Sequence, residues 1–353
     1  MRKSNRSFDI NFAVPPTLKF LKSLTSQTGI LQHTKYGVPH RSFGYSLDDN
    51  ARALLVAIKY HELFRKKEVL ELAVNYLSFI SHAKRNDGFF NNFQTFDHKF
   101  FPKISQDGFG ECVWALGATI ASDVTPNLKL AAKDLFSEIE KNIGKLASPR
   151  AQAYSILGLR QILKKEPKNK KALEQLKKLV GDLLALYEKY QDGEWHWFER
   201  SLAYANHILP AALFTAYQVL GDKKILEVAT KTLTFLEKET HTADGVPSPI
   251  GSDGWFPAGG EKAIFDQQPV EAAYAVLANL AAFEATRNKE YYEAAENWFS
   301  WFHGNNIKKA KVYDFSTGGC YDAVNERGVN LNQGAESIIC YLLAYLELAR
   351  FLK

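Results

Sequence analysis

The chain has 353 residues, of which 46% are apolar, 13% aromatic and 24% charged, and it contains three cysteines. This composition excludes disordered chains, which are poor in aromatics, collagens, which repeat glycine, and small secreted scaffolds, which are dense in cysteine. Lys and Arg outnumber Asp and Glu by 44 to 39, a net charge of +5. The only dense basic stretch, residues 164–178, has the pattern of a solvated helix face, so we expect no nucleic-acid partner.

The beginning of the chain predicts neither export nor membrane insertion. Residues 1–16 are basic but lack the apolar segment of about 7–15 residues that a secretory signal requires, and no run of about 18 apolar residues occurs elsewhere. We therefore expect a cytoplasmic protein without a membrane segment. Cys112, Cys320 and Cys340 are odd in number and form no CxxC motif, so we expect buried thiols, no disulfide framework, no metal and no cofactor.

Apolar residues recur at three- and four-residue spacing over most of the chain, which predicts amphipathic helices, and strand-like alternation appears only around residues 89–101. In chain order the predicted helices are 15–27, 48–65, 68–83, 109–122, 126–146, 149–164, 170–190, 207–220, 223–240, 268–287, 289–303 and 333–351. Short connections, as in helical hairpins, are expected at 65–67, 166–169, 221–222 and 287–288. Long ones, rich in Gly, aromatics, Asp and Asn, are expected at 28–47, 84–106, 191–205, 241–265 and 304–331, and such long loops are uncommon unless functional.

The predicted helices alternate between two kinds. Six are apolar or rich in small residues, as at 109–122 and 268–287, and the helices between them carry a single apolar stripe among Lys and Glu. A helix that is apolar around most of its circumference must be buried on most sides, whereas a striped one lies outside. We therefore predict an all-α fold, an (α/α)6 toroid formed by residues 1–353 as one domain, with a minor β-hairpin in a loop. Its long loops would lie on one face, above the N-termini of the inner helices.

The segments that begin the predicted inner helices share a polar signature. They read SLDDNAR (46–52), QDGFGE (106–111), SPRAQ (148–152), YANHILP (204–210), FDQQPVE (265–271) and NLNQGAE (330–336). A single Asp, Asn or Ser in such a place is an ordinary N-cap, and a proline in the first turn is an ordinary helix starter. Capping does not require the second polar group that most of these segments carry, so we expect these extra groups to converge on one rim.

A rim of carboxylates, amides and aromatic rings is suited to carbohydrate, because hydroxyl groups bond to the polar groups and the C–H faces of sugars stack on rings. Glycoside cleavage needs an acid near the leaving oxygen and a second carboxylate as base or nucleophile, or else phosphate held by Arg or Lys. We expect Asp49 and Asp266 to be the catalytic pair, with Asp48 as the cap that leaves Asp49 free to meet Arg52. The expected substrate-binding residues are His33, Arg41, Tyr45, Asp48, Arg52, Glu111, Trp195, Trp197, Glu199, Trp255, Gln267, Gln268, Gln333 and Glu336, with Asp107 and Glu271 as further candidate acids.

The segments 44–52, 148–159, 265–273 and 331–337, and most specifically QHTKYGVPHRSFGYSLDDNARAL (32–54), resemble a family of bacterial six-hairpin-glycosidase-like proteins. Related helical domains are found fused to glycosyltransferases. The resemblance spans nearly the whole chain and implies an (α/α)6 barrel that acts on or binds oligosaccharide, with mannose-containing sugars among the candidates. The chain departs from the family pattern at Ala205, where relatives carry an acid, and at Glu111, where they carry arginine.

Three functions remain open from the sequence. The first is hydrolysis or phosphorolysis of short oligosaccharides. The second is a non-catalytic carbohydrate-binding or accessory domain, in which Ala205 and Glu111 would mark lost function. The third is a sugar epimerase or isomerase, which needs two placed proton carriers, usually histidines, yet only His207 lies in the segments that begin the inner helices.

Overall fold

The computed structural model describes residues 10–352, and over these residues the chain forms twelve α-helices. They are α1 (Lys19–Leu24), α2 (Leu47–Phe64), α3 (Val69–Ala83), α4 (Gln106–Ala121), α5 (Pro126–Ile139), α6 (Pro149–Lys165), α7 (Lys170–Tyr190), α8 (Ile208–Leu220), α9 (Lys223–Glu239), α10 (Pro269–Thr286), α11 (Lys289–Ser300) and α12 (Ala335–Arg350). Short 3₁₀ turns occur at η1 (Arg41–Phe43), η2 (Glu140–Lys145) and η3 (Trp301–His303). Within this described part, no helix combines the length and the apolar character needed to cross a bilayer.

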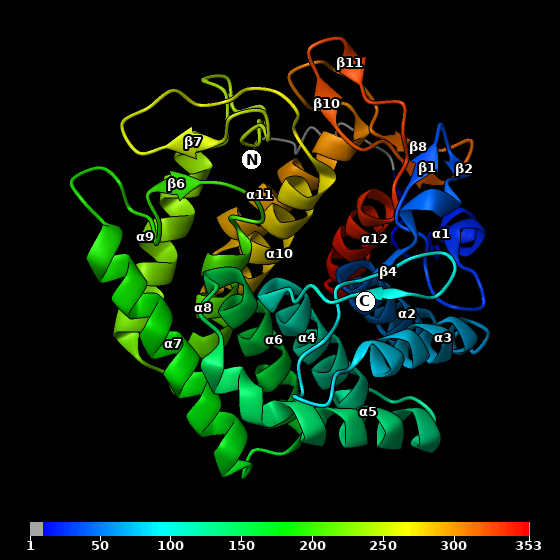
Figure 1. Ribbon diagram of the computed structural model, residues 1–353. Helices are drawn as coiled ribbons and strands as arrows, with labels where there is room; N and C mark the ends of the chain where they lie inside the picture. Colours follow the sequence, from blue (N-terminus) through cyan, green and yellow to red (C-terminus); the bar gives the residue numbers. More distant parts are fainter. Residues whose placement is uncertain (1–9, 353) are drawn as a thin grey trace.

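The even-numbered helices form the inner ring. Each packs against the next, from α2 through α4, α6, α8 and α10 to α12, and α12 packs back against α2 to close the circle. The outer helices α3, α5, α7, α9 and α11 each pack on the inner helix that precedes them in the chain, and the short α1 packs on α12. Figure 1 shows α5, α7 and α9 on the outside of this circle. The predicted (α/α)6 toroid and its division into inner and outer helices are therefore confirmed.

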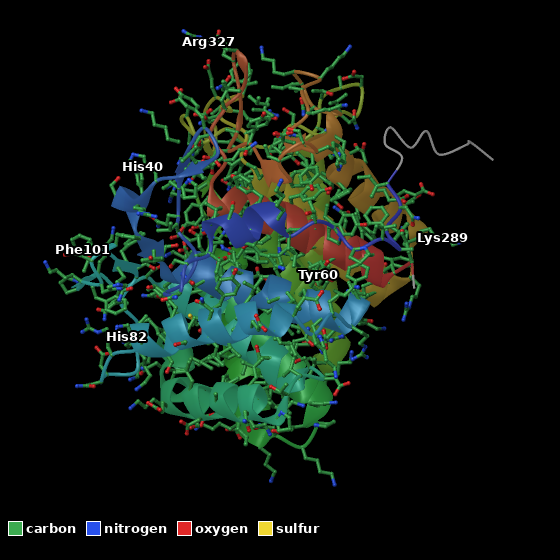
Figure 2. The ribbon with its side chains drawn as sticks, turned by 90° about the vertical axis from the view of Figure 1, so that its right-hand side faces the viewer. His40, Tyr60, His82, Phe101, Lys289 and Arg327 are labelled. Carbon is green, nitrogen blue, oxygen red and sulfur yellow. The ribbon has the colours of Figure 1, made fainter. Side chains whose placement is uncertain are left out.

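The two ends of the toroid differ in the connections they carry. In Figure 2, His40, Phe101 and Arg327 mark three of the long connections and lie toward the left and upper edge of the molecule, whereas Lys289, from a short connection, lies at the opposite side. All inner helices run in the same direction because each is followed by an antiparallel outer helix and a return. Their N-termini therefore meet under the long loops, at the end we call the loop mouth.

Serine side chains set the starts of three inner helices. Ser46, Ser105 and Ser148 are the N-caps of α2, α4 and α6, and each Oγ accepts a hydrogen bond from a backbone N–H one turn into the helix. The cap at Ser105 starts α4 at Gln106, before the predicted residue 109. By contrast α1 is only six residues long, much shorter than the predicted 15–27, because Thr25 already pairs with Ile30 in a β-bridge.

The long loops contain more strand structure than the single hairpin that the sequence predicts. Five small antiparallel sheets are present in residues 10–352: β1 (Thr34–Lys35) with β2 (Val38–Pro39), β3 (Tyr45–Ser46) with β4 (Phe93–Gln94) and β5 (Phe100–Phe101), β6 (Ser201–Leu202) with β7 (Phe256–Pro257), β8 (Tyr313–Asp314) with β9 (Gly319–Cys320), and β10 (Val324–Asn325) with β11 (Gly328–Val329). The β3–β4 and β6–β7 pairs join loops that are far apart in sequence. Two-residue strands leave no periodic signal, so the sequence pattern could not reveal them.

Glycines bring α4 and α6 into direct backbone contact. A Cβ atom at Gly158 would lie 2.3 Å from the carbonyl oxygen of Val113, and one at Gly117 would lie 2.3 Å from the carbonyl oxygen of Gly158. Real side chains do not tolerate such distances, so the two helices can approach this closely only because both positions lack a Cβ. This contact fixes the relative positions of the α4 and α6 N-termini, where Asp107, Glu111 and Arg150 lie.

Candidate functional site

Arg52 lies at the centre of a group of carboxylates at the loop mouth. Its side chain is only 3% exposed, and its Nη1 lies 2.7 Å from Glu336 Oε2, while Nε lies 3.4 Å from Glu111 Oε1. Its Nη2 lies 3.3 Å from Asp49 Oδ1 and 3.4 Å from Asp48 Oδ2. We call these five residues the Arg52 cluster. It joins the first turns of α2 and α12 to the start of α4, so three helices that are distant in sequence meet on one guanidinium.

The capping roles differ from the prediction. The N-cap of α2 is Ser46, not Asp48, and its Oγ also donates a 2.7 Å hydrogen bond to Asp49 Oδ2. Asp49 is therefore buried between Ser46 and Arg52, whereas the Asp48 side chain is 35% exposed at the same helix start. The predicted contact of Asp49 with Arg52 is present, but Asp48 is the aspartate that is open to the mouth.

Two of the four acids around Arg52, Asp49 and Glu111, are buried, and burial disfavours the charged form of a carboxyl group. Burial raises the pKa of Asp49 to about 8, with the charge of Asp48 adding to the rise and Arg52 opposing it. Burial also raises the pKa of Glu111 well above its ordinary value, again against the pull of Arg52. For Arg52, burial would lower the pKa, but Glu111 and Glu336 outweigh it and the pKa rises. Burial therefore favours the protonated forms of Asp49 and Glu111, next to the side chains of Asp48 and Glu336, which water reaches.

Glu271, in the first turn of α10, holds the chain that enters α8. Its carboxylate accepts hydrogen bonds from the backbone N–H groups of Ala205 and Asn206 and from Asn206 Nδ2. Burial raises the pKa of Glu271 to about 7, and these hydrogen bonds oppose the rise. Ala205 has a φ of 49°, a left-handed conformation that non-glycine residues adopt at a cost of about 1 kcal/mol or more. The bonds from Glu271 support that strained residue.

The three polar residues before α10, Asp266, Gln267 and Gln268, lie in different environments. Gln267 is fully buried, donates hydrogen bonds to Ser248 Oγ and Ile264 O, and accepts one from Trp301 Nε1. It therefore links loops to one another and is not accessible to a ligand, contrary to the expectation from the sequence. Gln268 is the half-buried N-cap of α10. Asp266 is half-buried, its backbone carbonyl accepts from Ser252 N–H, and its carboxylate is not part of the Arg52 cluster.

Three further expected ligands are internal supports instead. Tyr45 is 1% exposed and its hydroxyl bonds to Ser26 Oγ at 3.0 Å. Gln333 is buried where its backbone exchanges hydrogen bonds with Thr34, linking the last long loop to β1. Trp197 is fully buried against Phe198 and Phe235, so its ring cannot receive a sugar. Each is large and partly polar, which is why sequence alone placed it in the site.

The remaining expected ligands are partly or fully exposed. Trp195 is half-buried between Phe235 and Phe256, and its indole N–H donates to the carbonyl of Glu199. Trp255 is half-buried with its ring centroid 6.3 Å from that of Tyr204.

In the loop before α2, His33 is half-buried with its ring edge-on to Phe43. Arg41 is exposed, and its guanidinium lies 5.2 Å from the ring centroid of Phe96.

Sequence reasoning missed Arg150 and Tyr204. Arg150 is 3% exposed, pairs with Glu199 at 2.8 Å, and lies against the ring of Tyr204 with its Cζ 4.4 Å from the ring centroid. Arg150 stands in the first turn of an inner helix, in SPRAQ, and Arg52 stands one turn further along in SLDDNAR, and that parallel was the available signal. Tyr204 carried no signal beyond its place before α8.

Among residues 10–352, no group of three or more His, Cys, Asp or Glu side chains is arranged to hold a metal ion. In the Arg52 cluster the guanidinium fills the centre that a cation would need. The three cysteines are free and buried, as expected.

The chain shares its architecture with solved structures of a sugar epimerase, a D-mannose isomerase and an α-1,6-mannanase. The chain is similar to a sugar epimerase from a ruminal bacterium, with a TM-score of 0.73, 15% identity, and coverage of 95% of this chain and 96% of that one. A D-mannose isomerase gives a TM-score of 0.70 at 14% identity, with coverage of 94% and 96%. An inactive variant of an α-1,6-mannanase from Salegentibacter, in complex with an α-1,6-linked mannose oligosaccharide, gives 0.63 at 14% identity, also with coverage of 94% and 96%.

No protein-family model matches the chain, and no curated protein matches it. The structural likeness therefore rests on the arrangement of helices, which extends over almost the full length of each compared chain. The protein has the (α/α)6 toroid fold of the six-hairpin-glycosidase-like proteins.

Proposed function

We propose that this protein is a carbohydrate-active enzyme that cleaves glycosidic bonds in short oligosaccharides at the loop mouth, with Asp49 as the proton donor. The observation that carries the proposal is the Arg52 cluster, where a buried acid with a pKa of about 8 stands next to carboxylates that water reaches. Acid and base roles in glycoside cleavage are divided in this way, by environments that push the pKa values of neighbouring carboxyl groups apart.

Asp48 is the second carboxylate that the geometry favours. Asp48 Oδ2 and Asp49 Oδ1 both lie against Arg52 Nη2, at 3.4 and 3.3 Å, so these oxygens are at most about 7 Å apart and form a close pair. In the reaction Asp49 gives its proton to the leaving oxygen as the bond from that oxygen to the anomeric carbon breaks. In this close pair the Asp48 carboxylate bonds to the anomeric carbon as the leaving oxygen departs, and water, which gives a proton to Asp49, or phosphate then displaces Asp48 from that carbon.

Asp266 stays a candidate for that second role, as the sequence suggests, because it is half-exposed just before α10. The α10 helix is separated from α2 by α12 in the ring, so Asp266 would approach the sugar from another side. A wider separation between the two carboxyl groups would leave room for a water molecule and favour inversion at the anomeric carbon, whereas a close pair favours retention. The two assignments therefore predict different products.

The compared structures support a sugar substrate. The Salegentibacter mannanase was made inactive by replacing two consecutive aspartates, and it holds an α-1,6-linked mannose oligosaccharide. This chain also presents consecutive aspartates, Asp48 and Asp49, at the loop mouth. Mannose-containing oligosaccharides are therefore the first substrates to test.

The epimerase and isomerase neighbours favour a second function, yet the histidine that could serve it is directed elsewhere. His207, at the start of α8, is 1% exposed, and its ring lies 5.2 Å from that of Trp298 on the outer helix α11. Burial and the nearby His241 lower the pKa of His207 to about 3, so this side chain stays neutral over the physiological range. A carboxylate mechanism agrees better with the groups present at the loop mouth.

Product analysis by mass spectrometry tests the proposal. Wild-type protein is incubated with α- and β-linked manno-, gluco- and galacto-oligosaccharides, with and without inorganic phosphate, next to Asp49→Asn, Asp48→Asn and Asp266→Asn. We expect release of sugar or sugar phosphate that Asp49→Asn abolishes, and loss in Asp48→Asn but not in Asp266→Asn if the close pair acts. Epimerised product without cleavage would overturn the proposal in favour of the second function. Binding without any turnover would indicate an accessory domain.

A further inference from the structure

Tyr204 combines two properties that rarely occur together, an exposed ring and a rigidly fixed position. It lies in the turn before α8 and is 44% exposed. Its ring is therefore accessible to a ligand, while its neighbours hold it in one place.

Three contacts fix the ring and its backbone. The hydroxyl donates a 2.6 Å hydrogen bond to Asp107 Oδ2 on α4. The guanidinium of Arg150 covers one face of the ring, and Arg150 Nε donates a 2.5 Å hydrogen bond to the carbonyl of Tyr204. The next residue, Ala205, is held in its left-handed conformation by Glu271.

These supports are themselves anchored. Arg150 is only 3% exposed and pairs with Glu199. Its Nη2 has no hydrogen-bond acceptor among residues 10–352, and its guanidinium lies against the Tyr204 ring. Asp107 also accepts a hydrogen bond from Ser148 Oγ, the cap of α6. The hydroxyl and one side of the ring are thus held by residues near the N-termini of α4 and α6.

The position of the ring connects it with the proposed catalytic groups. Asp107, which holds the hydroxyl, stands one turn before Glu111 on α4, and Glu111 belongs to the Arg52 cluster. Arg150 and Glu271 lie close enough for the charge of Arg150 to oppose the raised pKa of the Glu271 carboxyl. The ring of Trp255 lies next to Tyr204, with ring centroids 6.3 Å apart and an interplanar angle of 53°.

We infer that Tyr204 and Trp255 form a subsite for one pyranose unit of an oligosaccharide, with the sugar stacked on the exposed part of the Tyr204 ring. The inference deepens the proposed function and rests on it. A pyranose offers C–H groups to an aromatic face and hydroxyl groups at its edge, where the carboxylates of Asp107 and Glu199 supply acceptors. A ring fixed before binding loses little conformational freedom when the sugar arrives, which increases affinity.

The test measures binding by isothermal titration with α-1,6-linked mannotetraose first, then with any oligosaccharide that wild-type protein cleaves. We expect Tyr204→Ala to raise Kd about 10-fold, the loss of one stacking contact. Tyr204→Phe keeps the ring and should stay within about threefold, because only the positioning bond to Asp107 is lost. Phe101→Ala, which removes a similarly exposed aromatic (56%) from β5, is the matched control and should leave Kd unchanged.

The outcomes separate this inference from the proposed function. If no oligosaccharide binds wild-type protein, the proposed function fails and takes the subsite with it. If sugar is bound and cleaved while Tyr204→Ala and Trp255→Ala both keep the wild-type Kd, the subsite is overturned and the enzyme remains. If Tyr204→Ala does not fold, Tyr204→Leu covers Arg150 with an apolar side chain without a planar face. Tyr204→Leu must then show the same 10-fold loss, and wild-type affinity in this variant would equally overturn the subsite.

Discussion

Asp49 makes the stability of this protein depend on pH in a direction that can be predicted. The pKa of its carboxyl is about 8 in the folded chain against an ordinary value of 3.8, because burial and the charge of Asp48 outweigh Arg52. The folded state therefore keeps a proton that the unfolded state releases. The stabilising contribution of this proton is fully present below about pH 4 and is lost as the pH rises through about 8.

The size of this contribution follows from the difference between the two pKa values of Asp49, in the unfolded and in the folded chain. Each pH unit between the two values changes the free energy of unfolding by about 1.4 kcal/mol for one proton, so the full window is worth on the order of 5 kcal/mol. Asparagine has nearly the shape of a protonated aspartate and cannot ionise. Asp49→Asn should therefore remove this share of the pH dependence while keeping the contacts with Ser46 and Arg52.

Equilibrium urea unfolding at pH 5, 6, 7 and 8, followed by tryptophan fluorescence, measures the effect. We expect the stability of Asp49→Asn relative to wild type to increase by about 1.4 kcal/mol for each pH unit, to a total of about 4 kcal/mol between pH 5 and pH 8. Asp134→Asn, which changes an exposed carboxylate on the outer helix α5, serves as the control and should run parallel to wild type. If the difference between Asp49→Asn and wild type is constant across this range, Asp49 is already charged at pH 5 and cannot be the proton donor.

Three further predictions, made with four variants, test the packing and the charge balance. Arg52→Met should lower the free energy of unfolding at pH 7 by about 3–5 kcal/mol, measured in the same urea assay, because it leaves several carboxylates facing one another without a cation. Gly158→Ala should lower the stability of the protein by about 1–3 kcal/mol, because the new Cβ meets the backbone of α4. Gly181→Ala, whose Cβ has nothing within 4 Å, should stabilise α7 by up to about 1 kcal/mol. Equal melting temperatures for these two variants would refute the close contact. Trp197→Ala should cost about 3–5 kcal/mol of stability in thermal and urea unfolding without changing oligosaccharide affinity at a temperature where it is folded, and a change in Kd would restore Trp197 to the site.

The helices and their nesting could be predicted because helix periodicity is a local property of the chain. Apolar residues at three- and four-residue spacing mark each helix, and the contrast between all-apolar and striped helices marks its layer. The predicted starts at 126, 149, 170, 223 and 289 agree with the structure to within one residue, since a capping residue or a proline stands at each.

The candidate site was predicted only in outline. Polar residues in the first turn of inner helices do gather at one mouth, and Asp49 does meet Arg52. Which member of an adjacent pair is buried depends on which side of the helix faces the ring, and a helix start that lies one residue earlier exchanges the two. Ser46 supplied the cap, so Asp48 became open and Asp49 became buried.

Aromatic residues in the loops could not be sorted by sequence. Trp197 and Trp255 look alike in composition and context, yet one is completely buried and the other half-exposed beside Tyr204. Pairing between distant loops, as in β6 with β7, decides this difference.

By itself the sequence determined the number, order and layering of the helices, because these depend on spacing that each segment carries alone. Only the tertiary structure decided that Glu111, Asp49 and Glu336 share one guanidinium and that Arg150 supports Tyr204. Those contacts join residues up to 284 positions apart in sequence. Their pKa values and exposure arise from burial and neighbouring charge, which exist only after the ring of helices has closed.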